Sequence, residues 1–218
     1  MSKTDKTLYA RSKVTALGLG YGMGAAKFFA TCTLYGMDVT APWCQDTVRQ
    51  WRLANREVVN YWYMLDRAAR QAAETDHTLE ITLPSGRTKT YFNVQLKFPE
   101  QLGVQTSLPQ SELKQDLWAS VTKGGRLMRT WGGSLTENLV QATARDILRD
   151  GILAVVDAKP HWQYITDVYD EVIFEVPKEE AAEAEVVIPK MLCITGETWA
   201  KGCPIAVEGK IIDFYQKI

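Results

Sequence analysis

The sequence predicts an α+β fold in which helices and antiparallel hairpins occupy separate stretches of the chain. Apolar residues recur with a helical period near the N-terminus and again over residues 134–156. Residues 79–98 and 165–177 each alternate like two strands joined by turn residues. Because the chain shows no extended β-α-β alternation, we do not expect a parallel sheet.

The N-terminal part reads as helices. Residues 4–19 have helical spacing, which the following glycines end, and residues 25–36 form a second predicted helix closed by Gly36. A short extended piece ends at Pro42. A long helix is then predicted from Cys44 to Glu74, with an apolar face made of Val48, Trp51, Val58, Trp62 and Leu65.

The remaining elements follow in order. Pro84-Ser85-Gly86 is the predicted turn of the hairpin over 79–98, whereas residues 100–130 are mixed and polar and give no assignment. The helix over 134–156 has Ser134 or Thr136 as its expected cap. Acidic residues lie at or near the junction of the two strands in 165–177. An acidic helix (177–192) and an extended tail (202–218) complete the chain.

The composition excludes several classes of protein. The chain has 218 residues, 46% of them hydrophobic, which suits one core with subdomains. It has no run of about 18 apolar residues and no apolar signal-peptide core. There are two histidines and four cysteines without C-x-x-C spacing: Cys32, Cys44, Cys193 and Cys203. We therefore expect a cytoplasmic protein without membrane association, zinc site or disulfide framework.

Charge is distributed unevenly along the chain. The net charge is −1, but residues 1–150 carry 19 Lys and Arg against 14 Asp and Glu, whereas residues 151–218 carry 6 against 12. Such asymmetry is typical of a basic binding surface beside an acidic end that can hold metal. Ordinary solvated surfaces explain the same counts equally well.

The glycine-rich stretch KVTALGLGYGMG, residues 13–24, allows a dinucleotide-binding interpretation. Gly20-x-Gly22-x-x-Ala25 matches a Rossmann turn, and Asp38 follows about 20 residues later, where an acid would bind the ribose. The segment before the glycines, however, has helical spacing with Lys and Arg and not the pattern of a buried strand.

A second interpretation of the same stretch uses side chains. Lys13, Leu17 and Tyr21 are four residues apart, so on a helix they share one face. A lysine, an apolar residue and an aromatic residue in that row suit a nucleoside triphosphate lying along the helix. A surface lysine with a core leucine and tyrosine is the purely structural alternative.

Five stretches, in order, resemble the family A DNA polymerases of bacteriophages. The row K-x7-Y-G, which begins at Lys13, is similar to motif B of the fingers helix. LPSGRTKTY (83–91) resembles their hairpin, and WGGSLTENLVQATARDIL (131–148) resembles the palm helix. VYDEVIFEVP (168–177) resembles motif C, and WAKGCPIAVEG (199–209) resembles the closing segment. The resemblance covers nearly the whole chain.

This resemblance implies a catalytic and nucleotide-binding set. Lys13 would bind the phosphates of the incoming deoxynucleotide, Leu17 would lie on the 3′ side of its sugar, and Tyr21 would lie beside the nascent base pair. Asp170 would be the metal-binding catalytic carboxylate of motif C, with Glu171 as its helper. A carboxylate at a strand junction is a hard oxygen ligand of the kind that Mg²⁺ prefers.

The resemblance also implies DNA contacts and shows departures from the family. Gln141 would face the duplex minor groove, with Arg145 one helical turn further along. Tyr169 stands where motif C usually has a histidine that contacts the primer end. Tyr9 stands where motif B usually has an arginine that grips the triphosphate.

Three regions follow from the same resemblance. A fingers-like helical region would span 1–75, a hairpin insertion and connecting segment 76–130, and a palm-like helix with the motif C hairpin and C-terminal tail 131–218. The expected α+β fold therefore consists of a helical fingers subdomain plus part of an antiparallel palm sheet packed on helices.

The sequence contains no segment like motif A, which supplies the first catalytic aspartate in this family. Two-metal transfer needs carboxylates that flank both ions, and a palm sheet without the motif A strand has an open edge. We therefore expect one subunit of a split DNA-directed DNA polymerase, which acts on primer–template DNA with deoxynucleoside triphosphates and Mg²⁺. A second polypeptide would carry motif A and the thumb. The alternative is a non-catalytic DNA-binding remnant or accessory module of the same fold.

Overall fold

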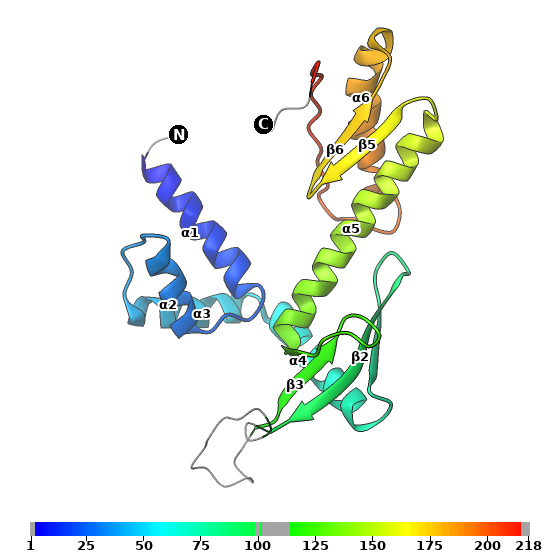
Figure 1. Cartoon of the computed structure of the whole chain (residues 1–218). Helices are drawn as coiled ribbons and strands as arrows, with labels where there is room; N and C mark the ends of the chain where they lie inside the picture. Colours follow the sequence, from blue (N-terminus) through cyan, green and yellow to red (C-terminus); the bar gives the residue numbers. More distant parts are fainter. Residues whose placement is uncertain (1–2, 99–100, 102–113, 215–218) are drawn as a thin grey trace. The chain divides into compact units, whose positions relative to one another are not determined.

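The computed structural model describes residues 3–98, 101 and 114–214, and its helices and antiparallel sheets confirm the α+β class (Figure 1). The chain forms two compact units. Unit 1 comprises Met1–Ile81 and Lys89–Leu139, and unit 2 comprises Thr82–Thr88 and Val140–Ile218. The names fingers and palm for parts of the chain stay a prediction.

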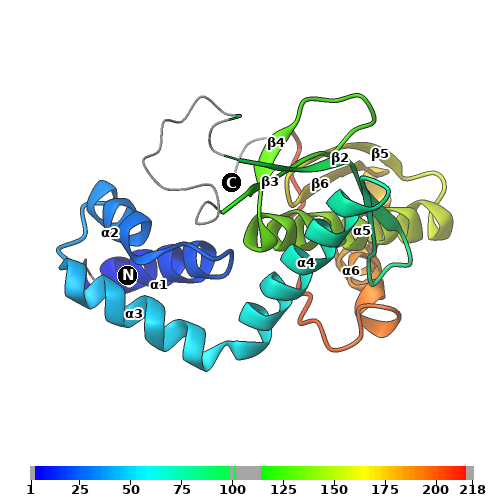
Figure 2. The same ribbon diagram turned by 90° about the horizontal axis from the view of Figure 1, so that it is seen from below.

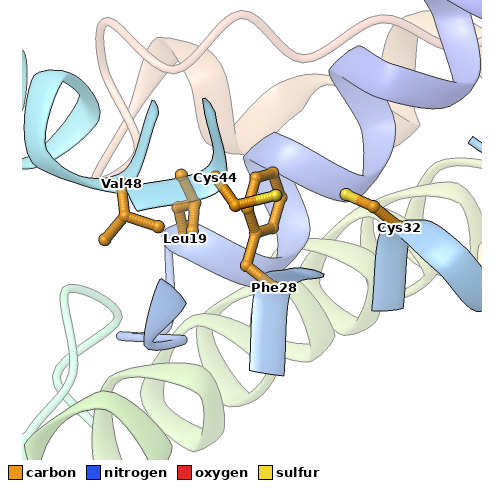
Figure 3. Packing of buried hydrophobic residues seen from close by; sticks show 5 residues of the cluster. All are labelled: Leu19, Phe28, Cys32, Cys44 and Val48. Carbon is orange, nitrogen blue, oxygen red and sulfur yellow. The ribbon is translucent and has the colours of Figure 1, made fainter. Parts of the chain in front are cut away.

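Unit 1 begins with three helices that share one apolar core. They are α1 (Lys3–Leu19), α2 (Ala25–Leu34) and α3 (Ala41–Ala54). Gly36 ends α2 with a φ of 68°, and its N–H donates to the Thr33 carbonyl at 2.9 Å, so the predicted closure is confirmed. Side chains from all three helices meet in the core, as Figure 3 shows for Leu19, Phe28, Cys32, Cys44 and Val48.

The single long helix predicted from Cys44 to Glu74 is wrong, because Asn55 divides it. α3 ends at Ala54 and α4 runs over Arg56–Glu74, and Figure 2 shows the change of direction between them. Asn55 has a φ of −119° and a ψ of 48°, and its side-chain amide donates to the Trp51 carbonyl at 2.8 Å. Asparagine breaks the helix here because its side chain competes for the backbone hydrogen bonds.

A four-stranded sheet, called sheet A below, completes unit 1. Its order is β1 (Thr78–Thr82), β2 (Thr88–Lys97), β3 (Asp116–Ser120) and β4 (Met128–Thr130). The first two strands confirm the predicted hairpin, whose turn includes Gly86 with a φ of 83°. Strand β2 pairs antiparallel with β3 with a register shift between Phe92 and Gln95, and β3 pairs antiparallel with β4.

The longest helix, α5 (Gly132–Ala158), begins two residues before the predicted cap. The Oγ of Ser134 accepts the backbone N–H of Trp131 at 3.0 Å, while Thr136 Oγ1 donates to the Gly132 carbonyl at 2.8 Å. The prediction of Ser134 or Thr136 as N-cap is therefore wrong. Ser134 instead satisfies the backbone donor of the residue that precedes the helix.

Unit 2 contains a two-stranded antiparallel sheet of β5 (Gln163–Val168) and β6 (Glu171–Glu175), as predicted. The 3₁₀ turn Lys178–Glu180 leads into α6 (Ala181–Leu192), and a second 3₁₀ turn spans Ile194–Glu197. α5, β6, α6 and the segment before β5 share an apolar core whose buried members are Ile152, Val155, Trp162, Ala184 and Leu192. Residues 203–212 form no helix or strand, which agrees with the predicted extended tail.

Candidate nucleotide and metal site

The predicted nucleotide-binding residues lie at the C-terminal end of α1 and just beyond it. Lys13 and Leu17 are exposed on the helix, and Leu17 keeps 55% of its surface accessible. Leu17 is thus not a core residue, so the alternative of a surface lysine with a core leucine and tyrosine is wrong for Leu17. Tyr21 is half-buried and lies two residues past the end of the helix, in a turn where Gly22 has a φ of 83°.

Close backbone contacts within unit 1 hold this turn in place. The indole N–H of Trp62 donates to the Gly20 carbonyl at 3.1 Å. A Cβ added at Gly133 would lie 2.1 Å from the Tyr21 carbonyl oxygen, and one at Gly132 would lie 1.9 Å from the Trp62 carbonyl oxygen. Only glycine fits such approaches. The start of α5 therefore fixes the backbone at Tyr21. The sequence Trp131-Gly132-Gly133 does not by itself indicate this contact.

The Rossmann interpretation of the glycine stretch is wrong. A helix and not a strand precedes Gly20, because α1 continues to Leu19. The sheets of the described residues are antiparallel where their register is defined. A dinucleotide fingerprint requires a preceding strand of a parallel sheet, so Asp38 has no ribose-binding context here.

The predicted motif C residues form the tip of the β5–β6 hairpin in unit 2. Val168 pairs with Glu171, and Tyr169 and Asp170 make the tight turn between them. Asp170 is exposed, and Glu171 is half-buried at the start of β6. Tyr169 is 93% exposed and has a φ of 59°, a backbone conformation that residues other than glycine, asparagine and aspartate rarely adopt.

Arg145, predicted to contact DNA, is held by an acidic residue of the hairpin. Its guanidinium forms an ion pair with Asp167, which also accepts a hydrogen bond from the Tyr164 hydroxyl. The hydrogen bonds from Arg145 and Tyr164 lower the pKa of the Asp167 carboxyl, and the same bond to Asp167 raises the pKa of Arg145. Gln141 is exposed on α5, one helical turn before Arg145.

Asp146 is a buried charge that sequence reasoning missed. Its side chain is 2% exposed and accepts hydrogen bonds from Ser85 and from Arg87 Nε at 2.8 Å, while Arg149 Nη1 lies 3.2 Å away. Arg87 also donates to the Ala142 carbonyl at 3.1 Å. Burial alone would raise the pKa of Asp146, but these hydrogen bonds and positive charges outweigh burial and lower the pKa.

The carboxylates of the described residues do not by themselves complete a metal centre. No group of three or more His, Cys, Asp or Glu side chains comes together within metal-binding reach in the part of the chain that the structure describes. Mg²⁺ often uses one or two protein carboxylates together with substrate phosphates and water. The exposed carboxylate of Asp170 fits one such position, whereas Asp167 is engaged by Arg145.

Comparison with known proteins gives one informative match. No family model matches the chain. The chain is 30% identical, over an alignment 227 residues long, to the DNA polymerase of Bacillus phage SP02. The match covers 96% of this chain and 33% of the phage protein, so the chain spans about a third of that protein's length. Among the described helices, none is long and apolar enough to cross a membrane.

Proposed function

We propose that this chain is part of a DNA-directed DNA polymerase that adds deoxynucleotides to a primer by two-metal nucleotidyl transfer, in the cytoplasm of a bacterial host. The similarity to a phage DNA polymerase over almost the whole chain carries this proposal. The exposed face of α1 and the acidic tip of the β5–β6 hairpin support it, because they carry the residue types that bind triphosphates and divalent cations.

In this proposal the end of α1 receives the incoming deoxynucleoside triphosphate. The ammonium of Lys13 binds phosphate oxygens as a point charge, and exposed Leu17 packs against the sugar. Tyr21 lies beside the nascent base pair, on a backbone that Gly133 and Trp62 hold rigidly. An aromatic side chain on a backbone held in this way would favour a correctly shaped base pair over a mispaired one.

The hairpin of unit 2 holds metal and primer–template DNA in the same proposal. Asp170 supplies a metal-ligand oxygen, Glu171 supports it, and Tyr169 contacts the primer end. Gln141 and Arg145 face the duplex. When bound, Mg²⁺ neutralises charge on the triphosphate and lowers the pKa of the primer 3′-hydroxyl.

The remaining catalytic carboxylates would come from a partner polypeptide that carries motif A. One observation supports this partner. In the part of the chain that the structure describes, β5 is an exposed strand of a two-stranded sheet, and an unpaired edge of this kind accepts a strand from another segment.

A non-catalytic DNA-binding module is the second candidate function. The observation that favours it is the lack of a three-carboxylate group among the residues placed by the structure. In such a module the cationic and aromatic side chains would still bind DNA, whereas substitution of Asp170 would leave its biological activity unchanged.

Primer extension with Mg²⁺ tests the proposal. The chain is assayed alone and with a polypeptide comprising the two thirds of the phage SP02 polymerase outside the match. Asp170→Asn is the test variant, and Asp157→Asn, an exposed acid of α5, is the matched control. We expect extension in the mixture, retained by Asp157→Asn and abolished by Asp170→Asn. Extension that survives Asp170→Asn would contradict the assignment of the metal ligand, and salt-sensitive DNA binding with no extension in any mixture would favour the non-catalytic module.

A further inference from the structure

Three of the four strands of sheet A carry an excess of positive charge. Strands β2 to β4 and the described residues beside them, 88–98 and 114–130, contain six Lys or Arg and a single acidic residue, Asp116, whereas β1 adds one acid, Glu80. The net charge of the whole chain is −1. A local excess of this size attracts polyanions to this part of unit 1.

A polar pocket of about 190 Å³ lies where sheet A meets α4. Its lining includes three cationic side chains, Arg70, Lys114 and Arg129, and the indole of Trp131. The acidic lining residues are Asp66 and Asp116. All of these residues belong to unit 1.

The two acids of the pocket are already neutralised. Asp66 pairs with Arg70 at 2.7 Å, and Asp116 pairs with Arg129 at 2.7 Å. Lys114 is exposed and has no acidic partner among the described residues, so it leaves a positive charge at the pocket. The side chain of Arg129 is 65% exposed, and its guanidinium uses only some of its N–H donors on Asp116, which leaves N–H groups for an incoming anion.

Trp131 joins this pocket to the turn that follows Tyr21. A Cβ at Gly22 would lie 3.5 Å from the Trp131 indole nitrogen, so the edge of the indole rests against that turn. Nevertheless, 48% of the Trp131 surface is accessible. An exposed indole beside cationic side chains is the combination that binds unpaired nucleotides, because every base has a face that stacks.

We propose that this pocket binds an unpaired nucleotide of the template strand, with Trp131 stacking on the base and with Lys114 and Arg129 binding adjacent phosphates. The site would hold the single-stranded template next to Tyr21, the residue proposed to lie beside the nascent base pair. The inference rests on the proposed function, because only a template-directed enzyme needs such a site there.

DNA binding by fluorescence anisotropy tests the site without requiring catalysis. Two labelled DNAs are compared, a blunt duplex and the same duplex with a single-stranded 5′ overhang on the template strand. Lys114→Glu is the test variant, and Lys27→Glu on α2 is the control, since both lysines are exposed residues of unit 1. We expect Lys114→Glu to weaken overhang binding by roughly tenfold and to flatten its salt dependence, while Lys27→Glu changes both DNAs little and equally.

A substitution of the indole separates stacking from charge. We expect Trp131→Leu to weaken overhang binding by about fivefold or more at every salt concentration, with an unchanged salt slope. Circular dichroism identifies variants that fail to fold. If Trp131→Leu does not fold, the Lys114→Glu result still tests the site, because Lys114 is exposed.

The inference would be overturned by equal losses for blunt and overhang DNA with Lys114→Glu, or by equal losses with Lys114→Glu and Lys27→Glu. A wild-type Kd for overhang DNA above about 100 μM at low salt would also overturn it. Primer extension that depends on Asp170, together with unchanged overhang binding in the pocket variants, would overturn this inference alone. Overhang-specific binding without extension would instead reject the proposed function.

Discussion

Arg87 and Asp146 form a charged contact between the β1–β2 turn and the middle of α5, with Arg87 Nε at 2.8 and 3.1 Å from the two carboxylate oxygens. Asp146 is buried, Arg87 is partly exposed, and Ser85 completes the contact from the same turn. A buried carboxylate is tolerated only when hydrogen bonds and positive charges replace its water. The turn and the helix therefore depend on each other within unit 2.

Removing the charge of Asp146 should destabilise the protein. We expect Asp146→Asn to lower the free energy of unfolding by about 3 kcal/mol, because it weakens a buried ion pair and several charge-assisted hydrogen bonds together. Urea unfolding followed by circular dichroism measures this change. Asp157→Asn, at an exposed position of the same helix, should change stability by about 0.5 kcal/mol or less. Equal effects of the two substitutions would contradict the structural role of Asp146.

The same carboxyl makes stability depend on acid. The pKa of Asp146 is lowered in the folded state, so its contribution is fully present above the unfolded pKa of about 3.9 and is lost as pH falls through the folded pKa. Wild type should therefore lose more stability than Asp146→Asn when the pH is lowered below that unfolded value. Urea titrations over an acidic pH series measure the difference, and parallel pH profiles would refute it.

Asp167 should restrain Arg145 from binding DNA. We expect Asp167→Asn to strengthen binding to primer–template duplex and to steepen the salt dependence of log affinity by about 0.9, the value for one added phosphate contact. Stability should change by about 1 kcal/mol or less, since Arg145 is largely exposed. Anisotropy titrations at several salt concentrations provide the measurement. Asp157→Asn removes the same charge from unit 2 and should leave the slope unchanged.

The glycine pair at the start of α5 should tolerate no side chain. We expect Gly132→Ala to destabilise the protein by about 2–3 kcal/mol, because its Cβ would overlap the backbone of Trp62 and force the helices apart. Gly24→Ala is the control, since a Cβ there meets nothing within 4 Å and φ is −81°. Its effect should stay within about 1 kcal/mol. Thermal unfolding compares the two variants.

Tyr169 should lower the stability of the protein while it contributes to primer extension. Because its φ of 59° is strained for tyrosine, Tyr169→Gly should stabilise the protein by about 1 kcal/mol. If the ring contacts the primer end, the same variant should extend primers more slowly in the partnered assay. Unfolding and extension are measured on the same preparations, with Tyr169→Phe as the control that keeps the ring and the strain. A glycine variant with unchanged extension would show that the ring has no role.

The helices and hairpins with regular periodicity were predictable from the sequence. The alternation around Pro84-Ser85-Gly86 and around Tyr169-Asp170 located both hairpins, because turn residues interrupt a period of two. Strands β3 and β4 were missed because they are short and lie in a polar region without clear alternation. The break at Asn55 was missed because a local side-chain hydrogen bond causes it, and the apolar period continues across it.

The candidate site was only partly predictable for a related reason. Lys13 and Asp170 lie in local patterns that a sequence displays. The roles of Asp146, Gly132 and Gly133 arise from contacts with distant segments, and nothing in their own neighbourhoods indicates those partners. Sequence reasoning therefore finds side chains that meet ligands more readily than the backbone contacts that position them.

The two buried cysteines in the core of α1, α2 and α3 allow the opening of that core to be followed by the modification of their thiols. Cys32 and Cys44 are at most 1% exposed, and burial raises the pKa of the Cys44 thiol, whereas Cys203 is exposed. A thiol-specific reagent should modify Cys203 first and reach Cys32 and Cys44 only when the three-helix core opens. Pulsed alkylation read by mass spectrometry would therefore time the opening of the core that anchors α1, the helix that carries Lys13 and Leu17. Adding deoxynucleoside triphosphate to the same experiment would show whether substrate closes it.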